Sequence, residues 1–453
     1  MCSFLIFLKS LQGNKNIDKL NKLLKLRGPD YTNMIDFNNY TFLHNLLHIC
    51  GKVTLQPFIK DNIVCLFNGE IYNYKSFGDI DSDGCCLIDL YLQYGQEFVT
   101  KLDGEFAIAL FDFNKNEVIL SSDIFGTKPL FYAYENGFII SSFRSILSKD
   151  FNMINIKQIE PNTCLKFNLD GQLINTISIH KFCLKQKKNN FDDWILAFEN
   201  AVKKRADTNK NIFITLSSGY DSGCLDLILK KLNITFASYT ILARERIDTI
   251  RKRLDYMKEY GKNHFIKLTE SEFDESKKYV ENNIDEIISP ILTQNKNKFP
   301  DGFVPHTNNT WAAYGLNYIF DRAKENNSII YLSGQGPDEI MGDYGFDGKK
   351  FKHYSQLNGV FPKKLSSVFP WNNFFNGTMR AFISKEEGVA SLHGIEGRYP
   401  YLDKNVVQEY LWLSPDLKNG NYKSPLAHYM KINNYAFDKN VKIGFKCHQK
   451  LKK

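Results

Sequence analysis

Residues 212–223 constrain the fold of this chain most; they read Ile-Phe-Ile-Thr-Leu-Ser-Ser-Gly-Tyr-Asp-Ser-Gly. The apolar, β-branched start predicts a buried strand, Ser-Ser-Gly predicts a tight turn, and the apolar spacing over residues 224–232 predicts a helix. A turn between a parallel strand and a helix N-terminus offers a phosphate unpaired N–H groups and a favourable dipole. No Gly-Lys-Ser/Thr follows, so this is not the P-loop of ordinary ATPases. This stretch alone leaves open a Ser/Gly-rich turn without a ligand.

Length and composition indicate a globular protein of two or three domains, because 453 residues with 43% hydrophobic side chains can bury large cores. The longest apolar runs are far shorter than a bilayer span, and the first residues lack the basic segment of a signal peptide. We therefore expect a cytoplasmic protein without a membrane partner. Nine cysteines without Cys-x-x-Cys pairs predict reduced thiols and no cysteine-based metal site.

The charge of the chain does not indicate a nucleic-acid partner. A net charge of +8 over 58 basic and 50 acidic residues is mild. The lysine clusters at 185–188 and 450–453 are interrupted and carry no interleaved aromatic residues, so we interpret them as solvated faces.

The chain changes character at a polar stretch over residues 185–190, which we interpret as a linker. Before it, short apolar runs between turn residues predict a β-rich unit with helices near residues 18–26 and 87–94. After it, helical periodicity alternates with strands, which is the pattern of a parallel sheet with ligands at its strand C-terminal ends. We predict domains over residues 1–185 and 191–453. The predicted strands are 62–67, 106–111, 117–120, 137–140, 212–216, 235–242 and 329–332.

Cys2 is the first residue with chemical potential, because removal of the initiator methionine would make it the N-terminus. Its free α-amino group, with a reference pKa near ~8, would then be a base beside the thiol. The alternative is an incidental second residue. Asn68-Gly69 follows a predicted strand and is a hairpin signal, yet an Asn amide beside an unhindered Gly N–H also supplies the two donors of an oxyanion hole.

Motifs along the whole chain, in collinear order, resemble those of the glutamine-hydrolysing asparagine synthetases. The resemblance implies an α+β N-terminal nucleophile-type layered sandwich, which is a class II glutamine amidotransferase domain, followed by an α/β parallel-sheet ATP-pyrophosphatase domain. The matching stretches are Cys2, 27–30, 68–73, Asp83, 123–132, 217–222 (SGGxDS), 333–339 (SGxGxDE), 393–403 (HGxExRxPFLD), Lys423 (KxxL) and 442–445 (KxGF).

The resemblance implies that the Cys2 thiolate attacks the side-chain amide of glutamine, while Asn68 and the Gly69 N–H hold the oxyanion. Asp83 matches the position that binds the glutamine α-ammonium group. The positions expected to bind glutamine are Leu46, Ile49, Cys50, Asn68, Glu70 and Asp83.

In the second half-reaction that the resemblance implies, ATP activates a carboxylate as an acyl-adenylate, and ammonia then displaces AMP. Asp221 and Asp338 would hold Mg²⁺ as hard oxygen ligands. Lys423 would stabilise negative charge, although a surface helix lysine is the alternative. The positions expected to contact ATP are Leu216, Ser217, Ser218, Gly219, Asp221, Ser222, Ile241, Ser333 and Gly334.

Three departures from the family pattern matter. Leu46 stands where the family has an arginine expected to bind the glutamine carboxylate, which predicts weaker glutamine capture unless His48 or Arg27 compensates. Gln335 stands at a catalytic position where asparagine synthetases carry a glutamate, and glutamine cannot take a proton. Tyr220 and Ser218 replace smaller residues of the phosphate loop, and serine would be strained there if the backbone needed a positive φ.

The sequence therefore predicts a glutamine-dependent asparagine synthetase that uses ATP as a substrate, Mg²⁺ and aspartate, with a homodimer expected only by analogy. One alternative is the same chemistry on another carboxylate, such as a sugar acid. Others are an enzyme that uses ammonia directly and a non-catalytic binding protein.

Overall fold

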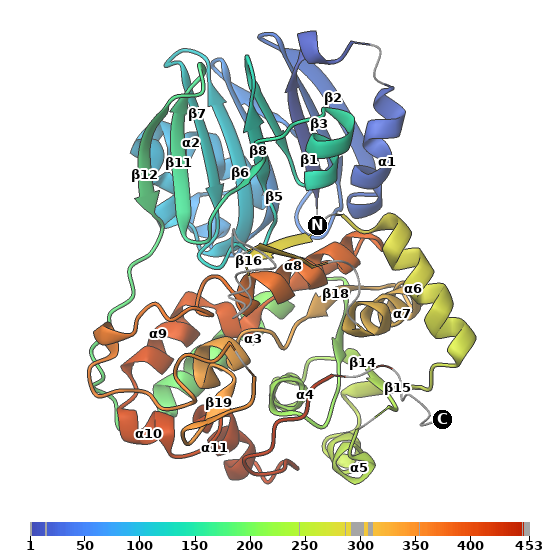
Figure 1. The fold of residues 1–453 in the computed structure, drawn as a ribbon, viewed down its shortest axis with the longest axis vertical. Coiled ribbons are helices and arrows are strands. Elements are labelled where there is room, and N and C mark those ends of the chain that lie inside the picture. The colour runs from blue at the N-terminus through green and yellow to red at the C-terminus, as the bar shows by residue number, and fades with distance from the viewer. Residues whose placement is uncertain are drawn as a thin grey trace. The chain divides into compact units, whose positions relative to one another are not determined.

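The computed structural model describes residues 2–13, 16–243, 245–285, 311–352, 354–445 and 447, with the backbone alone of 287–290 and 303–306. The chain divides into two compact units, each described below by itself (Figure 1). The first unit comprises Met1–Lys181, Asn283–Ile287 and Ala390–Glu396, and the second comprises Phe182–Asn282, Ile288–Val389 and Gly397–Lys453. The predicted domain ranges, 1–185 and 191–453, do not include such exchanged segments.

The first unit is built on two six-stranded sheets with antiparallel pairing. One has the order β10-β8-β9-β1-β3-β2 and the other the order β12-β11-β7-β6-β5-β4. Their strands are β1 Ser3–Leu8, β2 Tyr31–Phe37, β3 Tyr40–Leu46, β4 Phe58–Lys60, β5 Ile63–Ile71, β6 Gly104–Asp112, β7 Glu117–Ser122, β8 Phe131–Tyr134, β9 Phe138–Ser141, β10 Lys157–Gln158, β11 Thr163–Asn168 and β12 Leu173–Ser178.

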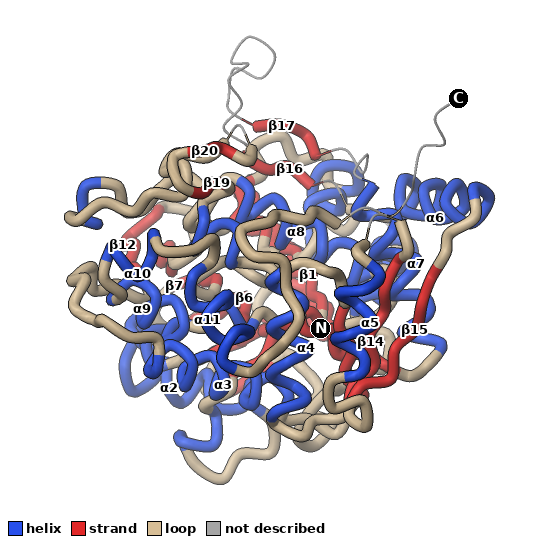
Figure 2. The backbone as a smooth tube through the Cα atoms, turned by 90° about the horizontal axis from the view of Figure 1, so that it is seen from below, coloured by secondary structure: helices blue, strands red, loops and turns tan. Residues whose placement is uncertain are grey.

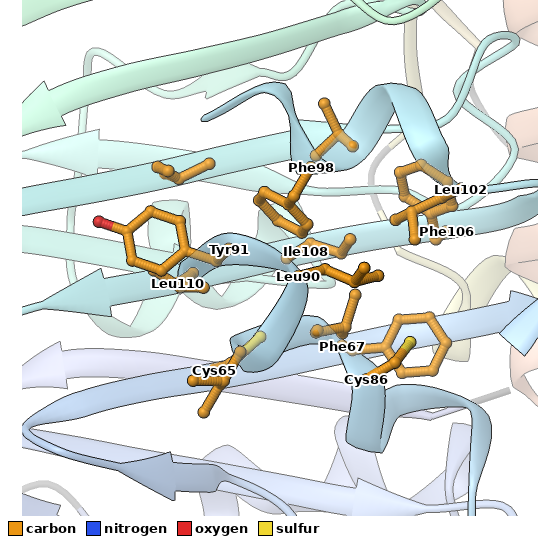
Figure 3. Packing of buried hydrophobic residues seen from close by; sticks show 14 of the residues in the cluster. Cys65, Phe67, Cys86, Leu90, Tyr91, Phe98, Leu102, Phe106, Ile108 and Leu110 are labelled. Atoms are coloured by element: carbon orange, nitrogen blue, oxygen red, sulfur yellow. The ribbon is translucent and has the colours of Figure 1, made fainter. Parts of the chain in front are cut away.

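Alternation along these strands sorts the side chains into separate cores, because successive residues of a strand point to opposite faces. In β5, Val64 and Leu66 join a cluster with residues of β1, β3, β6, β7, β8 and β9, which places it between the sheets. The alternate β5 residues Cys65 and Phe67 instead join a second cluster on the other face (Figure 3).

Helices cover the outer face of each sheet. Leu20 and Leu24 of α1 (Ile17–Arg27) pack with Leu5 of β1, and Leu90 and Tyr91 of α2 (Leu87–Tyr94) pack against the β5–β6 face. The unit is therefore a layered α+β sandwich of helix, sheet, sheet and helix, and the predicted fold class is confirmed.

The second unit contains a five-stranded sheet of order β15-β14-β13-β18-β21. β13 pairs in parallel with β14 and with β18, and β14 pairs in parallel with β15, which lies beside it in Figure 2. Parallel neighbours end at the same edge of a sheet, so the turns after β13, β14 and β18 lie together. These strands are β13 Asn211–Thr215, β14 Phe236–Ile241, β15 Gly261–Ile266, β18 Ser328–Leu332 and β21 Glu396–Arg398.

The remaining described helices alternate with these strands or follow them, which confirms the α/β class. They are α3 Asp192–Ala206, α4 Tyr220–Lys231, α5 Ile247–Asp255, α6 Glu270–Asn283, α7 Trp311–Glu325, α8 Thr378–Ser391, α9 Lys404–Trp412, α10 Pro415–Asn419 and α11 Ser424–Ile432. Two short pairs, β16 Ile287–Pro290 with β17 Phe303–His306 and β19 Gly345–Phe346 with β20 Lys349–Lys350, complete the description. Among the described residues, no helix combines the length and the apolar character that a bilayer crossing requires.

Each strand predicted from the sequence corresponds to an observed one, β5, β6, β7, β9, β13, β14 and β18, and the three predicted helices correspond to α1, α2 and α4. Residues 185–190, which we interpret as a linker from the sequence, lie within the second unit. Gln186 Nε2 donates to the Pro362 carbonyl at 2.9 Å, and Lys188 Nζ contacts Asp193 Oδ2 at 2.6 Å. These contacts fix the polar stretch to the second unit.

We predict that Phe111→Ala lowers the free energy of unfolding of the first unit by about 3 to 5 kcal/mol, because it opens a cavity between the sheets. The Phe111 ring is fully buried and lies 5.0 Å from that of Tyr40 and 5.5 Å from that of Phe42. Leu173→Ala is the control, because Leu173 is 51% exposed on β12 and should cost far less. Equal shifts of the denaturant midpoint for the two variants would contradict the assigned core.

Candidate active sites

A pocket in the first unit lies beside Cys2, which directly precedes β1. β3 contributes its last residue to the pocket wall, and β5 contributes Phe67, Gly69 and Glu70. The residues predicted for the first half-reaction that line this pocket are Cys2, Leu46, Ile49, Cys50, Gly69, Glu70 and Asp83. The structure therefore brings together residues that are up to eighty positions apart in the sequence.

Asn68 and Gly69 are adjacent in β5, and of the two only Gly69 lines the pocket. The Asn68 side chain is fully buried, and neither its nitrogen nor its oxygen has a hydrogen-bond partner among the described residues. Buried amides are normally satisfied, so this one is available for a ligand atom. Gly69 has a φ of 139°, and a Cβ there would lie 1.9 Å from the Glu105 carbonyl oxygen, so no larger residue fits. This arrangement is consistent with the predicted oxyanion hole.

The Cys2 thiol is buried, which disfavours its thiolate form. Burial raises its pKa to about 11, and the positive N-terminus opposes that rise. A base must therefore remove the proton before the sulfur can attack. Arg27 holds this residue in place, because its Nε donates to the Cys2 carbonyl at 3.0 Å. The sequence marked Arg27 through its motif and as a possible substitute for the missing arginine at position 46, but not as a residue that holds Cys2.

Two carboxylates lie at the acidic end of the pocket. Glu70 Oε2 accepts a hydrogen bond from Cys50 Sγ at 3.2 Å. Asp83 accepts the N–H groups of Ile71 and Gly84, each at 2.9 Å. Burial raises the pKa of Asp83 to about 6. Acidic side chains of this kind suit the ammonium group of an amino-acid ligand.

The apolar Leu46 side chain lines the pocket, and the two residues considered as its compensation have other partners. The His48 N–H donates to Asp30 Oδ2 at 2.8 Å, and its Nε2 lies 3.0 Å from the Gly51 carbonyl oxygen. Arg27 is bound to the backbone of Cys2. Lys52 also lines the pocket, but it pairs with Asp81 at 2.7 Å and its side chain is 78% exposed.

In the second unit, residues 216–219 form the turn between β13 and α4, and Asp221 and Ser222 lie in the first turn of α4. Ser217 N–H donates to Ser222 Oγ at 3.0 Å, and Gly219 N–H donates to Ser217 Oγ at 3.2 Å. Arg253 of α5 donates to the carbonyls of Ser217 and Gly219 at 2.6 and 2.8 Å. Ser218 is not among the residues with positive φ, so serine is not strained there.

Ser218 binds an anion of the chain itself. Its N–H and its Oγ both donate to Glu245 Oε2, each at 2.5 Å. Two donors that converge on one oxygen are the arrangement expected of a phosphate-binding turn. Glu245 could not be identified from the sequence, because a glutamate that follows a strand has no pattern that predicts a contact with Ser218.

Tyr220, a departure from the family loop, ties the turn to the C-terminal segment. Its hydroxyl donates to the Asp438 carbonyl at 3.1 Å and accepts the Asn440 N–H at 2.8 Å. The Tyr220 side chain thus holds the segment that leads to Lys442, which a smaller residue could not do.

Lys423 joins the two predicted metal ligands. Its Nζ lies 2.7 and 2.6 Å from the two carboxylate oxygens of Asp221 and 2.9 Å from Asp338 Oδ1. It is 2% exposed, so the surface-lysine alternative is wrong. Lys442 also pairs with Asp338, and Tyr422 donates to it at 2.7 Å. Burial acts to raise the pKa of Asp338, but the two lysines outweigh it and hold that pKa well below its usual range.

The turn after β18 contacts the turn after β13. A Cβ on Gly334 would lie 3.3 Å from Asp221 Cβ, which shows how closely the two approach. Ser333 is fully buried, and Gln335 follows it with partial exposure. Ile241 ends β14 and Leu216 follows β13, and both are buried. The nine residues predicted to contact ATP therefore come from three neighbouring strand ends.

Asp221 and Asp338 have the donor type that Mg²⁺ prefers, and both carboxylates contact Lys423. Their charges are balanced in the structure by Lys423 and Lys442. Among the described residues, no cluster of three or more acidic, histidine or cysteine side chains could hold a metal by itself. A magnesium ion that arrives with phosphate oxygens would complete its coordination there.

Comparisons with known proteins agree with this geometry. Residues 1–169 match the family of glutamine amidotransferase domains. A protein of Methanocaldococcus jannaschii, named as a candidate glutamine-hydrolysing asparagine synthetase, is 26% identical over 95% of this chain and 84% of its own length. The glutamine-hydrolysing asparagine synthetase of Bos taurus is 24% identical over 90% of this chain and 77% of its own. Asparagine synthetase B of Escherichia coli is 25% identical over 93% and 77%.

A solved glutamine phosphoribosylpyrophosphate amidotransferase from B. subtilis aligns at 13% identity over 58% of this chain and 81% of its own, with a TM-score of 0.33, too low to argue from. The sequence similarity, by contrast, extends through both units and accompanies the collinear motifs. The chain is similar to glutamine-hydrolysing asparagine synthetases over most of its length, and its first 169 residues match the glutamine amidotransferase domain family.

Proposed function

We propose that this protein is a glutamine-dependent, ATP-consuming amide synthetase that converts aspartate to asparagine. The observation that carries the proposal is the buried Lys423, which joins Asp221 and Asp338 at the strand ends where the sequence predicts ATP. The pocket at Cys2 supports the glutamine-dependent part, and the relatives named as asparagine synthetases support aspartate as the acceptor. The homodimer and the cytoplasmic location stay predictions.

In the first half-reaction, Cys2 Sγ attacks the side-chain carbonyl carbon of glutamine after a base takes its proton. Asn68 Nδ2 and the Gly69 N–H donate to the oxygen that becomes negative. The carbon–nitrogen bond breaks, ammonia leaves with the proton, and water hydrolyses the thioester to glutamate. Asp83 and Glu70 bind the α-ammonium group through their charge.

In the second half-reaction, a carboxylate oxygen of the acceptor attacks the α-phosphorus of ATP, and pyrophosphate leaves. The turn at Ser217–Ser222 binds the departing phosphates, and Lys423 supplies positive charge to them. Mg²⁺, when bound with ATP at Asp221 and Asp338, would neutralise further phosphate charge. Ammonia then attacks the acyl carbon, and the bond to AMP breaks.

A second acceptor class has a specific observation in its favour. Gln335 lies in the turn after β18 and cannot carry the charge of the glutamate found in asparagine synthetases proper. An acceptor such as a sugar acid would use the same adenylate chemistry without that charge.

We expect purified protein with ATP and Mg²⁺ to release pyrophosphate when aspartate is present, with either glutamine or ammonia as nitrogen donor. A panel of other carboxylates, including sugar acids, runs beside aspartate. Cys2→Ala should abolish release that depends on glutamine and retain release with ammonia, because the thiol acts only in the first half-reaction.

Lys423→Met should abolish pyrophosphate release with both donors. Release with another carboxylate would move the assignment to the second acceptor class. No release with any carboxylate would contradict the proposed function.

We predict that Leu46→Arg raises kcat/KM for glutamine about tenfold to hundredfold, because one charge-assisted hydrogen bond to the α-carboxylate is worth about 1.5 to 3 kcal/mol. Glutamate release measures the change. Leu46→Met is the matched control, since it fills similar space without charge and should leave kcat/KM unchanged. An unchanged kcat/KM in a well-folded Leu46→Arg variant would show that the glutamine carboxylate lies elsewhere.

The pH dependence of kcat/KM for glutamine should report Asp83. Its pKa of about 6 in the free protein means that the carboxylate is charged above pH 6. The negative charge is lost as the pH falls through that value. We therefore expect kcat/KM to decline about tenfold per pH unit below pH 6. Asp83→Asn should have a low kcat/KM without this decline. If the decline persists in Asp83→Asn, another group causes it.

A further inference from the structure

Glu386 of α8 faces the turn after β18. Its Oε2 accepts the hydroxyl of Ser333 at 2.6 Å, and its Oε1 accepts the side-chain amide Nε2 of Gln335 at 3.3 Å. The Gln335 N–H in turn donates to Ser333 Oγ at 3.1 Å. One carboxylate thus holds the two polar side chains of this turn.

A carboxylate at this place is costly, because Glu386 is only 6% exposed. A buried charge needs hydrogen bonds or a partner, whereas a neutral side chain of the same shape would avoid most of that cost. The neighbours that act on its charge are Lys385 and Glu387 on the same helix and Tyr331 on β18. Burial raises the pKa of Glu386 to about 7.

The contact also fixes the orientation of Gln335. A side-chain amide has a donor end and an acceptor end. Because Glu386 can only accept when ionised, it draws the Nε2 of Gln335 toward itself, which leaves Gln335 Oε1 on the opposite side of the amide. Gln335 is partly exposed in the turn that lies against Asp221.

We propose that Glu386 is a positioning residue of the amide-forming site, which clamps Ser333 and Gln335 so that Gln335 Oε1 accepts a hydrogen bond from the incoming ammonia. Gln335 carries no negative charge, but the Glu386 carboxylate on α8 places one beside it. This inference rests on the proposed function for its reaction, while the clamp on the ATP-binding turn stands by itself.

Three variants test the clamp. In Glu386→Gln, two amide groups face each other, so Gln335 must turn its N–H₂ outward or lose the contact. Gln335→Glu places two carboxylates face to face. The exchange Gln335→Glu with Glu386→Gln restores one carboxylate, one amide and an acceptor oxygen outward.

Glu387→Gln is the matched control. Glu387 is the adjacent buried glutamate of α8, and it accepts the Tyr399 hydroxyl at 3.0 Å. Thermal unfolding of each full-length variant identifies those that fold.

Two readouts follow from the proposal: ATP binding by calorimetry and amide formation with ammonia. We expect Glu386→Gln to weaken ATP binding about tenfold and to lower kcat for amide formation about hundredfold, with the exchange variant recovering at least about tenfold of each. Glu387→Gln should change neither by more than about threefold.

The outcomes separate the two claims. If wild-type protein binds ATP but forms no amide, the proposed function is wrong, and recovery of ATP binding by the exchange variant still decides the clamp. Equal losses in Glu386→Gln and Glu387→Gln, or no recovery in the exchange variant, would overturn the clamp. A wild-type protein that does not bind ATP would overturn both.

Discussion

The strand ends of the second unit depend on one buried ammonium group, that of Lys423. It begins α11 from a left-handed backbone, with a φ of 48°, and reaches an aspartate that lies 202 residues earlier in the chain. A buried charge is stable only when it is paired, and removal of one partner leaves the others uncompensated. Here the ammonium group has two carboxylate partners from separate turns, so the same contact that neutralises the lysine also holds those turns together.

In the first unit, by contrast, a buried polar group lacks a hydrogen-bond partner among the described residues. The Asn68 amide is buried without a partner among the described residues, at a cost of about 1 to 3 kcal/mol. The next residue, Gly69, approaches Glu105 so closely that no side chain fits there. A native protein retains such a group when a ligand satisfies it, and donors that are fixed before the ligand arrives need no reorganisation during a reaction.

Much of this architecture could be predicted from the sequence, because strand periodicity and turn residues are local signals. They located β5, β6, β13 and β18, and collinear motifs placed Cys2, Gly69 and Asp83 in one pocket. Contacts between distant elements could not be predicted in this way. Glu386 and Arg253 lie on helices without a motif, and only packing of those helices against the turns reveals them. The contacts of Gln186 and Lys188 are of the same kind, because a polar composition does not show whether a linker is bound by side-chain contacts.

The Glu245 carboxylate competes with phosphate for the donors of Ser218. The N–H and the Oγ of Ser218 both donate to the Glu245 carboxylate. On the proposed function, a phosphate that binds these donors must first displace the Glu245 carboxylate from them. The affinity for ATP is then the difference between the free energies of the phosphate contact and of the Glu245 contact. The displaced Glu245 side chain is free to act elsewhere in the loop between β14 and α5.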